Sequence, residues 1–154
     1  MYLAVVALTM FFLPIVSIII DHASNPSEFL IFQVGRWFVF WAVGVRLALA
    51  GLRQFFGPAF TAKEIFHINS DEALPLVREL GVANVAASAV GLLSLAFPDF
   101  ILPAAISAGI FYGAAGARHF VERRRSRNQN IAMASDIFLF VVLAVYLLAR
   151  ALPH

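Results

Sequence analysis

The chain has 154 residues, of which 62% are hydrophobic and 13% are charged, and its formal net charge at pH 7 is +2. An ordinary soluble domain carries about 25% charged residues, so this composition excludes a water-soluble globular domain. The apolar residues suffice for about five bilayer-spanning helices of about 20 residues each, which leaves little for a domain outside the membrane. The sequence contains no cysteine, which excludes disulfides, thiolate catalysis and cysteine-ligated zinc or iron–sulfur centres.

The first predicted span covers about residues 1–20 and carries no charged side chain. A secretory signal would have a basic start and a small-residue cleavage site. Neither is clear here, so we expect a retained helix. Pro14 lies inside this segment, where Ser17 or a neighbouring helix can satisfy the freed backbone groups. The breaker Asn25-Pro26 marks the loop that follows.

Four more hydrophobic segments predict spans at about residues 29–52, 75–97, 101–119 and 131–149. The tight turn at 97–100 makes the third and fourth spans antiparallel neighbours. Between the second and third spans, aromatic residues interleave with charged ones. This pattern indicates an interfacial helix at about 58–68 or, alternatively, a loop with buried aromatics.

These elements predict an all-α integral membrane protein that forms a single membrane domain over residues 1–154. Helices 2–5 would form an antiparallel four-helix bundle, and the N-terminal helix would pack outside it.

The cations are distributed unevenly between the two faces that five spans define. Loops 53–80 and 118–130, on the side of the N-terminus, hold eight of the eleven cations, whereas the opposite face holds only Arg150. By the positive-inside rule, the N-terminus is cytoplasmic and the C-terminus is outside. Four arginines crowd the second loop, where we expect contact with anionic lipid rather than with nucleic acid: Arg123, Arg124, Arg125 and Arg127.

Polar residues within the spans are candidate functional residues, because a charge at mid-membrane costs about 2.5–3.5 kcal/mol on insertion scales. The topology brings six of them, from four helices, into the cytoplasmic half: Arg46, Arg53, Glu79, Asn84, His119 and Asp136. In one interpretation, they pair with one another and fix the helix register. Arg46 or Arg53 would then pair with Glu79, and Asp136 would cap its own helix or pair with His119. In the other, they line a pocket that binds the polar head of an apolar molecule or relays a proton.

Arg36 is set apart from this group, because it lies nearer the outer face and has no acidic partner on its own helix. We expect it to snorkel outward towards Asp21, Glu28 or Asp99.

Small residues recur at four-residue spacing on the third and fourth spans, namely Ala83, Ala87 and Gly91, and Ala105, Gly109, Gly113 and Ala117. Such faces allow helices to approach closely. We therefore expect the third and fourth spans to pack tightly against each other, with a dimer seam as the alternative.

The four histidines are scattered without metal-ligand spacing, and the sequence has no glycine-rich phosphate loop and no nucleophile elbow. The sequence therefore predicts no catalytic residue and no metal, haem or nucleotide cofactor. A quinone or a lipid is left open as a bound molecule.

Three short motifs are Arg46-Leu-Ala-Leu-Ala-Gly51, Arg78-Glu79-Leu-Gly81-Val-Ala-Asn84 and Gly116-Ala-Arg-His119. In these motifs, and over about residues 30–150, the chain resembles an uncharacterised branch of the DoxX-like superfamily of small bacterial membrane proteins. The resemblance implies a bacterial inner-membrane location and a four-helix core, with Glu79, Asn84, His119 and Asp136 as characteristic polar residues. It also implies links to quinone-coupled sulfur oxidation in some members and to chaperoning of membrane proteins in distant relatives. The chain differs from the redox members in having no cysteine and no cofactor motif.

The leading functional hypothesis is a non-catalytic accessory or assembly partner of other membrane proteins. The alternative is a binder of a small apolar molecule with a polar head, a quinone or a lipid, with a link to redox chemistry. A third class is a small proton-linked transporter, which inverted repeats and broken helices would favour. The partners expected are membrane lipid and, for the leading hypothesis, another membrane protein.

Overall fold

The computed structural model of the chain describes residues 2–122 and 125–152, which are helical with short connections and contain no strand. Five helices within these residues are long and apolar enough to cross a membrane: Tyr2–Ser24, Leu30–Phe56, Asp71–Leu93, Pro98–Val121 and Arg127–Ala151. The predicted all-helical membrane fold with five spans is therefore confirmed.

Two of the five spans change helix type along their length. The first runs through α1 (Tyr2–Ala7), a π-helical turn η1 (Leu8–Phe12) and α2 (Leu13–Ser24), and the second runs through α3 (Leu30–Phe38), the π-helical η2 (Val39–Val45) and α4 (Arg46–Phe56). A short helix follows in α5 (Pro58–Phe60) and the π-helical η3 (Thr61–Ile65). The other spans are α6 (Leu74–Leu93) after η4 (Asp71–Ala73), α7 (Ile101–Val121) after η5 (Pro98–Phe100), and α8 (Arg127–Ala151).

The π-helical turns have local causes. In the first span, η1 comes just before Pro14, whose ring would clash with the carbonyl four residues earlier in a regular α-helix. In the second span, η2 leaves the carbonyl of Ala42 to accept a hydrogen bond of 2.9 Å from the Tyr112 hydroxyl of α7. A wider turn in the second span is thus stabilised by a neighbouring helix, as membrane helices require.

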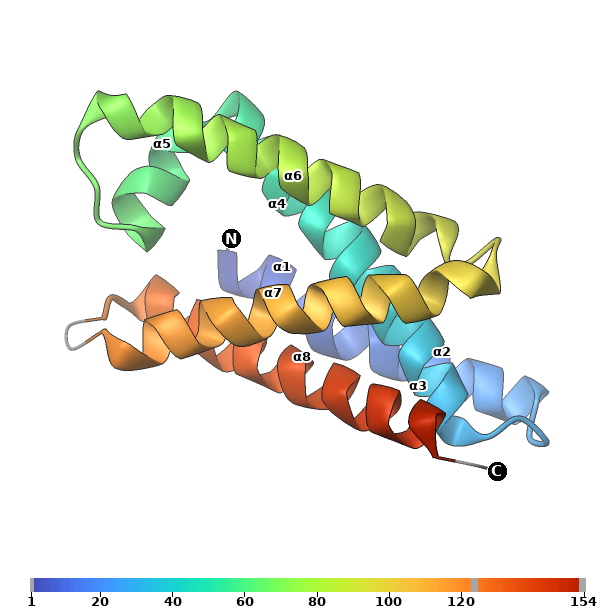
Figure 1. The fold of residues 1–154 in the computed structure, drawn as a ribbon. Coiled ribbons are helices and arrows are strands. Elements are labelled where there is room, and N and C mark those ends of the chain that lie inside the picture. The colour runs from blue at the N-terminus through green and yellow to red at the C-terminus, as the bar shows by residue number, and fades with distance from the viewer. Residues whose placement is uncertain (1, 123–124, 153–154) are drawn as a thin grey trace.

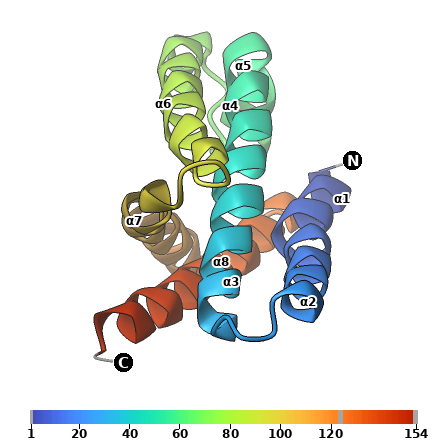
Figure 2. The same cartoon turned by 90° about the vertical axis from the view of Figure 1, so that its right-hand side faces the viewer.

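The second span is the centre of the molecule. In Figure 2, α6 runs beside α4, whereas α1 and α2 lie on another side of the same long helix, α7 lies to its left and α8 passes behind it. Buried side chains of the first span, among them Val6 and Met10, join the hydrophobic core that the second span shares with α7 and α8. The N-terminal helix is thus more than an outer addition to the four-helix core.

A very close helix contact joins the second span to α6 through two pairs of glycines. A Cβ built on Gly51 would lie 2.6 Å from the carbonyl oxygen of Gly81, and one built on Gly44 would lie 2.9 Å from the carbonyl carbon of Gly91. Only glycine allows the two backbones to come so near. These two contacts hold α6 along the second span.

The predicted tight packing between the third and fourth spans is wrong. In α7, a Cβ on Gly113 would meet the Phe140 ring of α8, whereas one on Gly109 would meet nothing within 4 Å. The small residues of α7 therefore serve its contact with α8, and α6 packs on the second span instead. From the turn that joins them, α6 and α7 diverge towards the end of the molecule that carries α5 (Figure 1).

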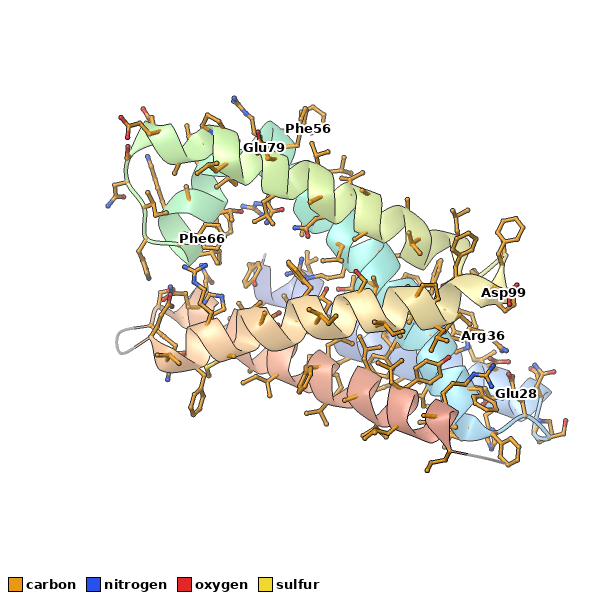
Figure 3. The ribbon with its side chains drawn as sticks, viewed as in Figure 1. Glu28, Arg36, Phe56, Phe66, Glu79 and Asp99 are labelled. Carbon is orange, nitrogen blue, oxygen red and sulfur yellow. The ribbon has the colours of Figure 1, made fainter. Side chains whose placement is uncertain are left out.

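The expected outward reach of Arg36 is confirmed. Its guanidinium lies 2.8 Å from the carboxylate of Asp21 and 2.6 Å from that of Glu28. The indole of Trp37 also donates to Asp21, over 2.8 Å. Figure 3 shows Arg36 beside Glu28 at the end of the molecule away from α5. This cluster joins the first two spans, and Asp99 takes no part in its ion pairs among the described residues.

Candidate ligand-binding site

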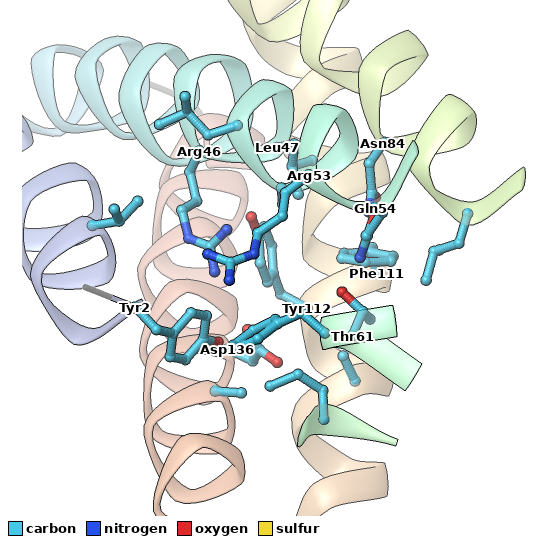
Figure 4. A pocket seen from close by; sticks show the side chains of 18 of the residues that line it. Tyr2, Arg46, Leu47, Arg53, Gln54, Thr61, Asn84, Phe111, Tyr112 and Asp136 are labelled. Carbon is cyan, nitrogen blue, oxygen red and sulfur yellow. The ribbon is translucent and has the colours of Figure 1, made fainter. Parts of the chain in front are cut away.

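A cavity of about 530 Å³ lies between the diverging helices, a volume in the range of small-molecule sites. Its walls come from all five spans and from the short helix α5–η3, as Figure 4 shows for most of its residues. The polar members of its lining are Tyr2, Arg46, Arg53, Gln54, Thr61, Asn84, Tyr112, His119 and Asp136. Five of the six residues predicted to gather here are therefore brought together.

Arg46 and Arg53 project into the cavity from the same face of α4, with their guanidinium groups side by side (Figure 4). Seven residues correspond to about two helical turns, which is why the two side chains share a face. Arg53 lies 3.8 Å from the centroid of the Phe60 ring, and Arg46 lies 5.7 Å from that of Tyr2. Neither arginine forms an ion pair with a carboxylate of the described residues.

One atom of Arg46 is left without a partner. Its Nε is buried and has no hydrogen bond, the one such side-chain nitrogen or oxygen among the described residues. Buried donors in proteins are nearly always bonded, so an orphan of this kind calls for an explanation.

Asp136 lies across the cavity from these arginines, on α8 (Figure 4). Its carboxylate forms no ion pair or hydrogen bond with the described residues, so neither predicted partnership is present. It does not cap its helix, because α8 begins at Arg127, and Ser126 caps it through a capping box with Gln129. Asp136 instead lies more than two turns into the span.

Asn84 donates a hydrogen bond of 2.7 Å to the side-chain oxygen of Gln54. This bond joins α6 to α4 at the cavity wall, beyond the glycine contact at Gly51 and Gly81. Sequence reasoning missed Gln54, although it directly follows Arg53 at the polar end of the helix. It also missed Tyr2, because the first span was expected to lie outside the bundle.

His119 has a different partner from the one predicted. Its Nδ1 lies 3.3 Å from the carboxylate of Glu122, which also accepts a bond of 3.0 Å from the Gln129 amide. Gln129 in turn donates to the carbonyl of Ile65 and bonds the ring of His67, each over 2.8 Å. The fully buried Gln129 thus fastens the segment after α5 to the ends of α7 and α8, beside the cavity. The sequence signal that could have revealed Gln129 is the Ser-x-x-Gln pattern of a capping box, from Ser126 to Gln129.

Glu79 lies outside this site. It is exposed on α6 and points away from the cavity in Figure 3. The predicted pairing of Glu79 with Arg46 or Arg53 is wrong, and the reason is geometric. Five residues separate Glu79 from Asn84, which is about 140° around a helix, so both cannot face the same cavity.

The basic loop predicted to contact lipid is described in part, since Arg123 and Arg124 lie outside the described residues. Arg125 donates three hydrogen bonds of 2.9–3.0 Å to the carbonyls of His119, Phe120 and Glu122. It therefore satisfies the last carbonyls of α7, as basic residues commonly do at helix ends. Arg127 is exposed at the start of α8.

The chemistry of the cavity follows from these residues. The guanidinium groups of Arg46 and Arg53 face the carboxylate of Asp136, so the summed formal charge of the three groups is positive when all are ionised. Arginine donors match the geometry of phosphate and carboxylate groups. No cluster of three metal-ligating side chains occurs within the described residues. The remaining walls are largely apolar, with Leu47, Leu49, Leu80 and Phe111 among them.

Taken together, the five long apolar helices define a multi-pass, all-helical membrane protein. The chain belongs to DUF6790, a family of unknown function, whose model matches residues 4–153. No curated protein and no solved structure matches it.

Proposed function

We propose that this protein binds one small amphipathic molecule from the membrane and holds its acidic head between Arg46 and Arg53. The buried Nε of Arg46 without a hydrogen-bond partner is the observation that carries this proposal. A buried donor left without a hydrogen bond costs about 1–3 kcal/mol, and a phosphate or carboxylate bound by this guanidinium in the cavity offsets that cost. Asp136 accepts a hydrogen bond from a hydroxyl or amine of the same head.

This proposal places the binding role ahead of the accessory role that the sequence alone favoured. The cavity and its orphaned donor support binding, whereas no described feature points to a particular protein partner. The DoxX-like resemblance stays a proposal too, and it offers a quinone as the alternative occupant. A quinone has only neutral acceptors for the two arginines, so an acidic head suits their charge better.

The test compares ligands that share a chain and differ in the head. The purified protein is heated with octyl phosphate, octyl glucoside, octyltrimethylammonium or a short-chain quinone. A ligand that binds only the folded state raises the melting temperature in a saturable way. We expect this rise with octyl phosphate and not with the other three.

Variants then locate the effect. Arg46→Gln and the more exposed Arg53→Gln remove charged hydrogen bonds of about 1.5–3 kcal/mol, so each should weaken octyl phosphate binding at least tenfold. Arg78→Gln is the matched control, because Arg78 is exposed on α6 outside the cavity. An equal response to octyl glucoside would contradict the acidic head, and a saturable response to the quinone alone would favour the alternative occupant. Unchanged octyl phosphate binding in both cavity variants would refute the site.

We also propose that the protein lies in a bacterial inner membrane with this cavity in the cytoplasmic half. The support is the excess of cations on the loops at that end, in line with the positive-inside rule.

A further inference from the structure

A second cavity, of about 450 Å³, lies between α6 and α7. Leu47, Asn84 and Phe111 line both cavities, so the second begins where the first ends. It extends from there towards the turn that joins α6 and α7, because its lining includes Val90 and Pro103. The two cavities are therefore neighbours that share these three side chains as a border, and the charged groups lie in the first.

The second cavity exists because small side chains face each other across diverging helices. Ala83 and Ala87 line it from α6, and Ala104 and Ala108 line it from α7. Of these four residues, Ala83 and Ala87 were expected to bring α6 into contact with α7. Since α6 is held against the second span by its glycines, the small side chains instead leave a space.

Its lining suits a hydrocarbon chain. No charged side chain lines it among the described residues, and the polar ones are Asn84, at the junction, and Ser107. Asn84 is already bonded to Gln54. An apolar chain therefore loses nothing by entering this space, whereas a polar group would find few partners there.

We infer that the second cavity holds the apolar chain of the ligand whose head lies between Arg46 and Arg53. The ligand is then a single-chain acidic amphiphile, since one apolar cavity adjoins the charged cavity along α6 and α7. It reaches the site sideways from the membrane, between these two helices. This inference rests on the proposed function, and it adds the shape of the ligand and the route by which the ligand enters from the membrane.

The test fills the second cavity and compares a long ligand with a short one. Ala87→Leu adds bulk from α6, and Ser107→Leu adds it from the more exposed position on α7. Ala89→Leu is the matched control, because Ala89 is exposed on α6 and lines neither cavity. The affinities of dodecyl phosphate and butyl phosphate are measured for each protein in nanodiscs of one neutral lipid composition, so that partition into the bilayer is the same throughout.

Burying one methylene changes an affinity about fourfold, so losing room for two or more should weaken dodecyl phosphate binding at least tenfold. We expect this loss in Ala87→Leu and Ser107→Leu, with butyl phosphate binding unchanged and Ala89→Leu like the wild type. If both ligands bind and the filling variants still hold dodecyl phosphate normally, the chain lies elsewhere and the inference is wrong. An equal loss in the control would also overturn it. If neither ligand binds even the wild type, the proposed function itself fails.

Discussion

Arg36 and Arg46 are two arginines on one long helix with opposite surroundings. Arg36 lies within hydrogen-bond distance of Asp21 and Glu28 and so has two carboxylate partners. Arg46, about three turns further along, has a buried Nε with no hydrogen-bond partner. A charge inside a membrane helix is a candidate functional site by default. The different surroundings of the two arginines separate a structural charge from a candidate functional one. The cluster of Arg36 joins helices, whereas we propose that Arg46 binds a ligand.

The structural role of Arg36 leads to a stability prediction. Arg36→Ala removes the partner of Asp21, whose side chain is only 8% exposed, and breaking a buried pair in this way costs about 3 kcal/mol. Thermal unfolding in detergent should therefore begin at a clearly lower temperature. Arg150→Ala is the control, because Arg150 is exposed and its described contact is with the Phe32 ring. Equal stability of the two variants would show that the Asp21–Arg36–Glu28 cluster does not hold the first two spans together.

At the residue scale, the sequence correctly predicted those site residues whose spacing along one helix decides which face they share. The seven-residue spacing of Arg46 and Arg53 placed both correctly on one side of α4. Glu79 was misplaced because it was grouped with Asn84 by depth in the membrane and not by angle around the helix. Tyr2 and the Gln129 network could not be found in this way, since both depend on which helices become neighbours.

Among the elements, the contact between α4 and α6 determines where the cavities lie. It holds α6 on the second span through Gly51 and Gly81, so α6 leaves α7 soon after their shared turn. Hydropathy predicted the spans well, because every one of them must supply about 20 apolar residues. It could not predict this choice of neighbour, since small residues occur on α4, α6 and α7 alike.

A pair of glycine variants tests this contact. In Gly51→Ala, the new Cβ would meet the carbonyl oxygen of Gly81 at 2.6 Å, and such overpacking costs about 1–3 kcal/mol. In Gly109→Ala, the new Cβ meets nothing within 4 Å, and alanine favours a helix over glycine by about 1 kcal/mol. Unfolding should therefore become easier in the first variant and no easier in the second. The same outcome for both would argue against a close approach at Gly51.

For the whole molecule, the five candidate spans of the described residues predict that the two termini lie on opposite sides of the membrane. The end of α8 lies at the same end of the molecule as the Arg36 cluster, and the cavity lies towards the loops rich in cations (Figure 1). A reporter such as alkaline phosphatase, active only outside the cytoplasm, should be active when fused after the C-terminus. A fusion in the loop at 66–70 should be inactive, and a fluorescent reporter should give the opposite pattern. Equal activity at both positions would contradict the five-span arrangement.

The central claim is that the two adjoining cavities hold an acidic amphiphile. Native mass spectrometry of the protein, gently extracted from its own membrane, tests this most directly. The account predicts a bound small molecule with an acidic head and one apolar chain, retained in Arg78→Gln and lost when Arg46→Gln and Arg53→Gln are combined. A bare wild-type protein, or a small molecule held equally by all variants, would contradict the claim. A co-migrating protein without any small molecule would contradict it too and would favour the accessory role.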